Sequence, residues 1–327
     1  MRQLEVALIG AGLIARYHLD AWIGAGAAVR VHSDDGRAGD LAREFGVRAV
    51  GSLAEALDGA HAADICTPTA THRDIALAAI AAGVGVVCEK PLAATTAEAE
   101  EIVAAAERAG VRLYPAHDVR FAPAFARLHE LVAAGGVGAG TVARFTASAY
   151  HPRPWTGHAS ARSGGIVSDQ MLHGVDLAYW IFGDVVRVHA WYQGEIAAPA
   201  PTGAVATGTA VLTHASGALS QIVSRWTATP VPPVRVTFHV SGTDGTVLHD
   251  TEWPQEVRVA DGTVENFGHM GEIPFVAEMR EFARAFTGGP EPRLGARDAL
   301  AAVRITQASA ESAWTGRAVE LPVEGIA

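Results

Sequence analysis

The sequence predicts an α/β protein in which a doubly wound parallel sheet is followed by an α+β domain with a mainly antiparallel sheet. Up to about residue 118, short apolar runs alternate with helical stretches, which is typical of a parallel sheet covered by helices on both faces. Beyond residue 140, strand-like segments follow one another without intervening helices, which indicates antiparallel pairing. The predicted domains are therefore residues 1–118 and residues 119–327.

Composition limits the function classes. The 327 residues suggest two domains, and 49% hydrophobic with 18% charged residues indicates a large core rather than disorder. A net charge of −10 argues against a nucleic-acid or membrane-surface partner. The longest uncharged apolar run, residues 76–88, is interrupted by glycines and too short to span a bilayer. Cys66 and Cys88 lie in predicted buried strands, so we expect reduced thiols and a cytoplasmic protein.

The first strand and helix carry a phosphate-binding signature. The apolar run 4–9 predicts a strand buried on both faces, and a helical stretch follows as far as Trp22. Gly10 permits the tight turn between them, Gly12 lets the backbone approach a pyrophosphate, and Ala15 allows close helix–strand packing. The helix N-terminus then offers free N–H groups to phosphate. This context predicts a dinucleotide site, the alternative being a plain strand–helix turn, at the sequence Gly10-Ala11-Gly12-Leu13-Ile14-Ala15.

The second predicted strand, residues 28–32, ends at a candidate ribose-binding residue. In dinucleotide sites an acidic residue about 20 positions beyond the glycines accepts hydrogen bonds from the adenosine ribose. Asp34, after Ser33, fits this position, and its carboxylate would repel a 2′-phosphate, which favours NAD. Ser33 and the nearby Arg37 leave NADP open, and a solvated turn is the structural alternative.

The rest of the first domain places a lysine at a strand end. The predicted strand 84–88 delivers Glu89 and Lys90 at its C-terminal end, where open α/β sheets bind their ligands. A merely solvated lysine is the alternative. The other elements expected in this domain are strands at 47–50, 63–66 and 111–115 and helices at 38–45, 53–57, 72–82 and 96–109, with Ser52 and Thr95 or Thr96 as helix caps.

The second domain begins with a helix and continues as strands. Turn signals at residues 213–217 join two of these strands in a hairpin. The predicted helices are 124–134, 275–286 and 296–315, and the predicted strands are 142–150, 185–195, 204–212, 218–226, 234–241, 246–249 and 256–260.

A polar stripe follows Gly164 and Gly165. Asp169 and His173 are four residues apart and Asp176 lies three further on, which puts all three on one face of an α-helix. A carboxylate beside an imidazole is a simple acid/base unit, because the carboxylate fixes the tautomer of the ring and stabilises its cation. The alternatives are a solvated helix face and a metal site, but no further ligands have supporting spacing, so we expect no metal. Asp176 is expected to be structural.

Several motifs together resemble the glucose–fructose oxidoreductase, inositol dehydrogenase and MocA-like (Gfo/Idh/MocA) family. The combination of Glu89-Lys90-Pro91 with the Asp169 and His173 stretch is the specific part, and the resemblance covers essentially the whole chain. The other matching pieces are Gly10-x-Gly12 with His18, Thr67-Pro68-x-x-x-His72, Arg120-Phe121-x-Pro123, Gly242-Thr243-x-Gly245 and Glu311-Ser312-Ala313-x-x-Gly316-Arg317-x-Val319.

The resemblance implies an N-terminal Rossmann domain and a C-terminal open-faced sheet that forms a homodimer or homotetramer interface. It implies NAD(P)-dependent oxidation or reduction of a sugar, cyclitol or related polyol, with Lys90, Asp169 and His173 at catalytic positions. His18 and His72 would lie near the cofactor, although each could be a satisfied helix histidine. The residues expected to contact the cofactor are Gly10, Gly12, Leu13, Ile14, Ser33, Asp34, Thr67, Pro68, His72, Glu89 and Lys90.

The chain departs from the family pattern at three places, one of which is a slightly short segment after the second strand. Ile166 replaces the third glycine of a frequent Gly-Gly-Gly, and Trp155-Thr156 replaces a frequent Trp-Arg pair, for whose arginine Arg153 and Arg162 are the candidates. The segment 150–158 is polar, aromatic and rich in proline, which suits the wall of a polyol site as well as an ordinary surface loop. The predicted substrate contacts are His117, Arg153, Trp155 and His158.

In the oxidation direction, we expect His173 to take the hydroxyl proton as the hydride leaves. Asp169 would orient His173 or bind a neighbouring hydroxyl, and Lys90 would stabilise alkoxide character on the reacting oxygen. Two alternatives stay open: a reductase of a nucleotide-linked keto-sugar or another biosynthetic carbonyl compound, and a non-catalytic NAD(P)-binding sensor or regulatory protein.

Overall fold

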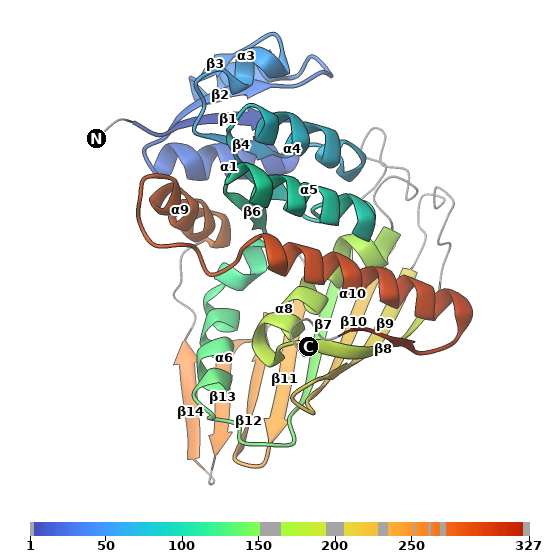
Figure 1. The fold of residues 1–327 in the computed structure, drawn as a ribbon. Coiled ribbons are helices and arrows are strands. Elements are labelled where there is room, and N and C mark those ends of the chain that lie inside the picture. The colour runs from blue at the N-terminus through green and yellow to red at the C-terminus, as the bar shows by residue number, and fades with distance from the viewer. Residues whose placement is uncertain are drawn as a thin grey trace. The chain divides into compact units, whose positions relative to one another are not determined.

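The computed structural model describes residues 3–150, 165–193, 206–227, 235–251, 253–260, 263–268 and 273–322. The chain forms two compact units, one of residues 1–121 with 272–300 and the other of residues 122–271 with 301–327 (Figure 1). The predicted division after residue 118 stays a prediction; the compact units differ from it chiefly because residues 272–300 pack with the first unit. No helix in the described ranges is long and apolar enough to cross a membrane.

The first unit contains a six-stranded parallel sheet in the order β3-β2-β1-β4-β5-β6. This doubly wound order confirms the predicted fold class, and its topological switch point lies between β1 and β4. Both central strands are almost fully buried, as expected of strands covered on two faces, and Asp64 of β4 is their one buried charged residue. The strands are β1 (Glu5–Ile9), β2 (Ala28–His32), β3 (Arg48–Ala49), β4 (Ala62–Ile65), β5 (Gly85–Glu89) and β6 (Leu113–Ala116).

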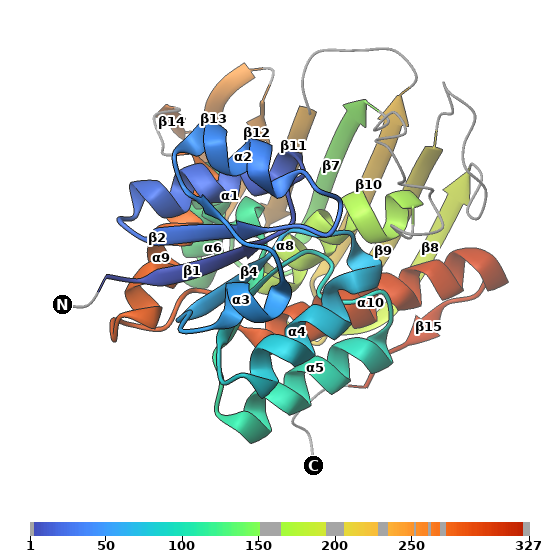
Figure 2. The ribbon, with the colours of Figure 1, turned by 90° about the horizontal axis from the view of Figure 1, so that it is seen from above.

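Helices cover both faces of this sheet (Figure 2). Alternate residues of β1 face the two layers: Val6 and Leu8 pack in the core beneath α1, α2 and α9, whereas Ala7 and Ile9 pack beneath α3 and α4. Ser52 caps α3 as predicted, and Thr95 forms a capping box at α5. The helices are α1 (Leu13–Gly24), α2 (Ala38–Phe45), α3 (Leu53–Leu57), α4 (His72–Ala81), α5 (Thr96–Ala109) and α9 (Pro274–Phe286), with single-turn helices η1 (Thr69–Thr71) and η2 (Asp118–Phe121).

Helix α9 joins this unit although about 150 residues of chain separate it from β6. Its Phe282 stacks on Tyr114 with ring centroids 5.3 Å apart, and its Phe275 stacks on Tyr17 of α1 at the same separation. Asp298, which follows α9 in the chain, forms a partly buried ion pair of 3.0 Å with Arg120 of η2. The sequence predicts helix α9 but not this placement.

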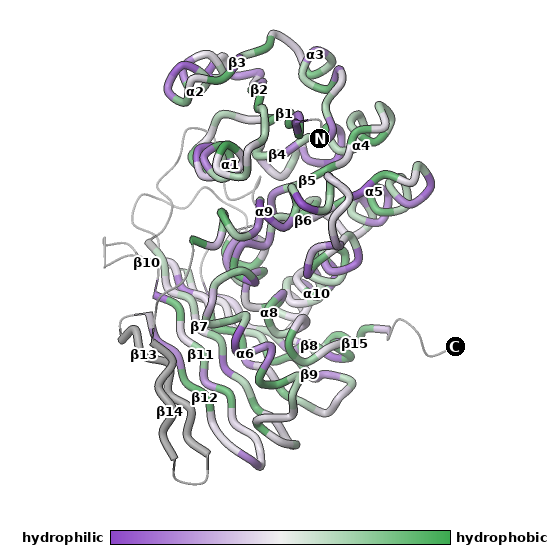
Figure 3. Tube along the Cα trace, turned by 90° about the vertical axis from the view of Figure 1, so that its left-hand side faces the viewer, coloured by the Kyte–Doolittle hydropathy of each residue, from purple (hydrophilic) through white to green (hydrophobic). Residues whose placement is uncertain are grey.

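The second unit contains a nine-stranded sheet in the order β14-β13-β12-β11-β7-β10-β9-β8-β15. All pairs are antiparallel except β7 with β10, which confirms the mainly antiparallel prediction. Hydropathy alternates along its described strands, as in a sheet with one buried face (Figure 3). Its strands are β7 (Val142–Tyr150), β8 (Val185–Gln193), β9 (Ala206–His214), β10 (Leu219–Thr227), β11 (Arg235–Gly242), β12 (Gly245–Asp250), β13 (Trp253–Ala260), β14 (Thr263–Gly268) and β15 (Val319–Glu320), of which β14 and β15 are not predicted.

Three helical segments pack against this sheet: α6 (Pro123–Ala133), η3 (Val167–Met171) with α8 (Leu172–Phe182), and the later part of α10 (Ala296–Thr315). Ser312 fixes α10 to the sheet by accepting a hydrogen bond from the Ala190 N–H (2.9 Å) and donating one to the Arg317 carbonyl (2.6 Å). Residues 167–171 form a π-helix, η3, rather than the regular α-helix that the predicted spacing of Asp169 and His173 assumes.

Candidate active site

The turn after β1 is built for close contact between the ends of two strands. Gly10 has a φ of +111°, and a Cβ added to it would lie 2.6 Å from the Cys66 carbonyl oxygen at the end of β4. Only glycine fits both constraints. Gly12 caps α1 with no side-chain hydrogen bond, and a Cβ added there would meet nothing within 4 Å. Helix α1 therefore begins at the switch point of the sheet without a side-chain cap, which is where a pyrophosphate site is expected.

Leu13 and Ile14 form the first turn of α1 beside this site. The Leu13 side chain is exposed and Ile14 is half-buried. An exposed leucine at the mouth of a phosphate turn offers an apolar surface on which a nucleotide can rest.

The segment after β2 separates its two aspartates. Asp35 accepts hydrogen bonds from Ser33 (2.7 Å) and from the Arg37 side chain (2.7 Å), and the Arg37 interaction lowers the pKa of Asp35 to about 2. The side chain of Asp34 is 98% exposed and lies 3.1 Å from the ring of His32, which is itself almost fully buried. Asp34 is therefore the carboxylate with room for ribose hydroxyls.

His72 connects the loops that follow β4 and β5. At the start of α4, its Nε2 lies 2.8 Å from the Thr67 carbonyl oxygen and its Nδ1 lies 2.8 Å from the Pro91 carbonyl oxygen. Only a protonated ring donates to both carbonyls, yet burial disfavours that cation and lowers the pKa of His72. The neutral ring donates to one of the two carbonyls, and it lies between the Thr67 loop and the Lys90–Pro91 turn.

Glu89 and Lys90 stand at the end of β5, as predicted. The Glu89 carboxylate is buried; it lies 3.2 Å from Nε2 of His18 and accepts a 2.9 Å hydrogen bond from the main-chain N–H of Lys90. Lys90 is half-buried and joined to Pro91 by a cis peptide bond. It is also the only lysine among 25 lysine and arginine residues of the chain.

The single lysine distinguishes Lys90 by composition as well as by its place in a motif. Arginine serves every other cationic position, so composition alone favours arginine. An arginine remains charged throughout the physiological pH range, whereas a lysine ammonium can give up a proton and concentrates its charge at one atom. A lysine at this position therefore offers proton-transfer chemistry that an arginine does not.

Two further titratable residues follow β6. Burial raises the pKa of Asp118 to about 6, with Glu89 adding to the effect and Lys90 opposing it. His117 is 2% exposed, so a substrate can contact it only if its binding site extends inward to this side chain. Its predicted substrate contact stays a prediction.

The donor atoms of His18, Asp64 and Cys66 lie within 4.8 Å of one another, the one grouping with metal-ligand spacing that the described residues contain. His18 already interacts with Asp64 at 2.9 Å and with Cys66 at 3.3 Å, and Trp22 donates to Asp64 at 2.7 Å. These hydrogen bonds account for the arrangement without an ion. The expectation of no metal stays a prediction.

In the second unit, Asp169 and His173 sit on a helical segment pressed tightly onto the sheet. A Cβ added to Gly174 would lie 2.6 Å from Ile222 of β10, so glycine permits the close approach of α8. Gln170 donates a 2.8 Å hydrogen bond to the Ala147 carbonyl near the C-terminal end of β7. Asp169 and His173 are half-buried, whereas Asp176 is 1% exposed, which fits a structural role for Asp176.

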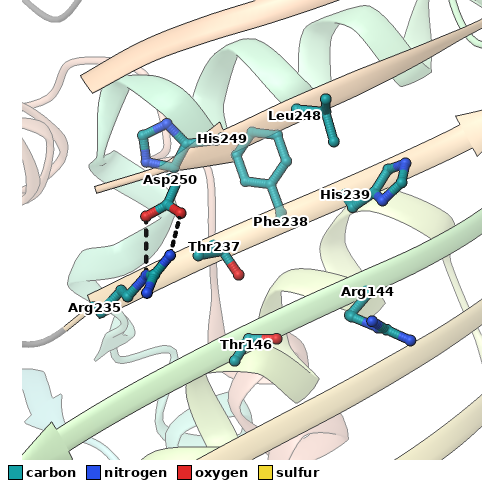
Figure 4. A pocket seen from close by; sticks show the side chains of 9 residues that line it. All are labelled: Arg144, Thr146, Arg235, Thr237, Phe238, His239, Leu248, His249 and Asp250. Carbon is teal, nitrogen blue, oxygen red and sulfur yellow. Dashed lines mark hydrogen bonds and ion pairs between the residues drawn. The ribbon is translucent and has the colours of Figure 1, made fainter. Parts of the chain in front are cut away.

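The open face of the same sheet holds a separate cavity of about 450 Å³ (Figure 4). Arg235 and Asp250 form an ion pair across its floor (2.6 Å), and Arg144 donates to Gln221 (2.8 Å). None of the predicted site residues lines it. Arg153, Trp155 and His158 lie outside the described residues, so their predicted substrate contacts stay predictions.

Comparison with known proteins identifies the family. Residues 4–117 match the GFO/IDH/MocA oxidoreductase family with its NAD-binding Rossmann fold, and residues 125–248 match the GFO/IDH/MocA C-terminal domain. The chain is 30% identical to the D-apiose dehydrogenase of Paraburkholderia graminis, over 98% of this chain and 90% of that protein. It is 30% identical to D-xylose 1-dehydrogenase (NADP(+)) 2 of Haloferax volcanii, over 90% of this chain and 92% of that one.

A solved structure is similar over its whole length. GenD2 from gentamicin A biosynthesis, in complex with NAD, superposes with a TM-score of 0.82 and 28% identity over 99% of this chain and 97% of that one. The chain therefore belongs to the GFO/IDH/MocA family of oxidoreductases, which confirms the resemblance, and its first unit is an NAD-binding Rossmann domain.

The two glycines of the phosphate turn give a matched pair of variants. We expect Gly10→Ala to lower the free energy of unfolding by at least about 2 kcal/mol, because it combines positive φ with a backbone clash. Gly12→Ala should cost less than about 1 kcal/mol, because its Cβ meets only open space, yet it should weaken NADH binding by occupying the approach of the pyrophosphate. Denaturant titration and NADH fluorescence check both; unchanged NADH affinity in Gly12→Ala would contradict the assignment.

Proposed function

We propose that this oxidoreductase transfers a hydride between a nicotinamide cofactor and a carbinol or carbonyl carbon of a sugar, cyclitol or related polyol. The observation that carries the proposal is Lys90, the single lysine, at the C-terminal end of β5 next to the phosphate turn. The names of the relatives support the substrate class, because D-apiose and D-xylose dehydrogenases both act on sugars.

The bound cofactor supplies the hydride acceptor or donor. Lys90 would donate a hydrogen bond to the reacting oxygen and stabilise its alkoxide character. His173 would take the hydroxyl proton in the oxidation direction and return it in the reduction direction. Asp169 would orient the imidazole or bind a neighbouring hydroxyl. The joint action of Lys90 with Asp169 and His173 is part of the proposal and rests on their chemistry and on the family motifs.

We propose NAD as the preferred cofactor. The exposed Asp34 carboxylate is available for ribose hydroxyls and would repel a 2′-phosphate. Arg37, the cation that would otherwise favour such a phosphate, is paired with Asp35 at 2.5 Å. The complex of GenD2 with NAD is in line with this choice, whereas the name of the Haloferax relative records NADP for that enzyme.

We further propose a homodimer or homotetramer in the cytoplasm, formed through the nine-stranded sheet. Large apolar side chains are exposed on the strands of this sheet, at Val142, Trp191, Leu219 and Leu248. Contiguous exposed apolar groups mark association surfaces, and Val142 and Leu219 lie at paired positions of β7 and β10. Both cysteines are unpaired thiols, as expected for a reducing compartment.

Substitution of the acid/base residues tests the proposed chemistry. With a polyol that the wild-type protein oxidises, Lys90→Ala and His173→Ala should each lower kcat by ~10²–10⁴-fold, because one acid/base group typically contributes that much. NADH affinity should remain within a few-fold of wild type for His173→Ala. His239→Ala is the control, since His239 is an exposed histidine on β11 of the same unit, and its kcat should match wild type. Full turnover in His173→Ala would refute the assignment.

Cofactor choice is tested separately. Asp34→Ser should reduce the NAD over NADP preference in kcat/KM by about tenfold, because it removes one charge that repels the 2′-phosphate. Asp35→Ser removes a neighbouring carboxylate that is already paired, so it should free Arg37 and raise NADP affinity without loss of NAD affinity. An unchanged NAD over NADP preference in Asp34→Ser would contradict the proposed role of Asp34 in cofactor choice.

A further inference from the structure

The first unit holds a buried charge cluster that the phosphate turn does not require. His18 lies in the middle of α1, is fully buried, and points toward the ends of β4 and β5. Phe275 of α9 closes the cluster on one side, with its ring centroid 5.6 Å from that of His18. Contacts with Asp64, Glu89 and Phe275 account for the position of the His18 ring.

Both nitrogens of His18 face carboxylates. Nδ1 lies 2.9 Å from an oxygen of Asp64, and Nε2 lies 3.2 Å from an oxygen of Glu89. A carboxylate accepts and a neutral imidazole carries one N–H, so the imidazolium alone satisfies both contacts. Burial acts to lower the pKa of His18, but the charge of Asp64 and the hydrogen bond to it outweigh burial and hold that pKa well above its usual value.

Glu89 links His18 to the turn that carries Lys90. One of its oxygens faces His18 and the other accepts the main-chain N–H of Lys90 at 2.9 Å. We propose that His18 is a positioning residue for Lys90: its buried imidazolium fixes Glu89, which fixes the Lys90 turn, and its positive charge offsets the carboxylates around the lysine. The inference rests on the proposed function in that it names what places the lysine which that proposal makes catalytic.

The charges around His18 make its own charge necessary. The imidazolium lies between the carboxylates of Asp64 and Glu89 and balances their charge. The buried carboxyl of Glu278 on α9 has no hydrogen-bond partner among the described residues, and burial raises its pKa well above the usual value. The titratable groups that interact with His18 are Asp64 in β4, Cys66 after β4, Glu89 at the end of β5, Asp118 after β6 and Glu278 on α9.

The single lysine makes the test specific. Trace labelling with an amine-reactive anhydride over a pH series, followed by peptide mass spectrometry, reports the pH at which Lys90 becomes reactive, with the terminal amine as internal reference. The measurement uses the full chain without substrate, so it does not depend on turnover. A failed polyol screen would therefore sink the proposed function and leave this result standing.

His18→Gln and Trp22→Phe form the matched pair. Both side chains are buried on α1 and both bond Asp64, but only His18 carries charge and reaches Glu89. We expect His18→Gln to move the labelling midpoint of Lys90 upward by about one pH unit, because loss of a nearby cation favours the ammonium. Trp22→Phe should lower the denaturation midpoint and leave the labelling midpoint in place.

Two results would overturn the proposal. One is an unchanged labelling midpoint in His18→Gln; the other is an equal shift in Trp22→Phe, which would show that packing alone is responsible. If His18→Gln does not fold, nitrogen-15 NMR of the wild-type chain decides instead. Both ring nitrogens of His18 should be protonated at neutral pH, and a neutral ring would refute the claim. Metal analysis of the purified wild type adds a check, because a stoichiometric ion at His18 would also refute it.

Discussion

The close approach of β1 to the end of β4 is the constraint on which the first unit depends. Gly10 brings its backbone against the Cys66 carbonyl, and no residue with a Cβ fits there. From that contact α1 begins at the switch point of the sheet, with its N–H groups toward the cofactor site. The same helix then carries His18 to the ends of β4 and β5, where Asp64 and Glu89 meet it. The proposed phosphate turn and the proposed positioning of Lys90 thus both depend on α1.

Buried charged groups near the phosphate turn keep their partners in one geometry, whereas exposed ion pairs between flexible side chains do not. An exposed ion pair contributes little to the free energy of folding. A buried imidazole such as His18, bonded on both nitrogens, has one orientation and fixes its partners. His72 performs a similar task with carbonyl groups, joining the Thr67 loop to the Pro91 turn. The loops after β4 and β5 therefore have few conformations available, which is the preorganisation that an electrostatic catalyst needs. Lys90, the one lysine of the chain, stands where these constraints converge.

The sequence was sufficient for most elements because local patterns determine them. Buried strands read as apolar runs, and Ser52 and Thr95 announce the helices they cap. It could not reveal the packing of α9 against α1, because contacts such as Phe275 with Tyr17 join residues about 250 positions apart. Nor could it reveal the π-helix at 167–171, since side-chain periodicity assumes the α-helical register. The sequence also could not reveal the His18 cluster, because its members lie on separate elements and their spacing in the chain matches no metal-binding or catalytic motif.

In the second unit, the helical segment with Asp169 and His173 is held against the sheet by Gln170 and by the close approach at Gly174, so a rigid scaffold carries the proposed acid/base pair. The central claim is that this chain moves a hydride between nicotinamide and a polyol carbon. Incubation of the wild-type protein with NAD and a set of sugars and cyclitols deuterated at their carbinol carbons tests it most directly. The account predicts that mass spectrometry finds the label at C4 of the reduced nicotinamide for at least one of them. Saturable NADH binding with no transfer of label from any sugar or cyclitol would contradict it and would favour a cofactor-sensing protein.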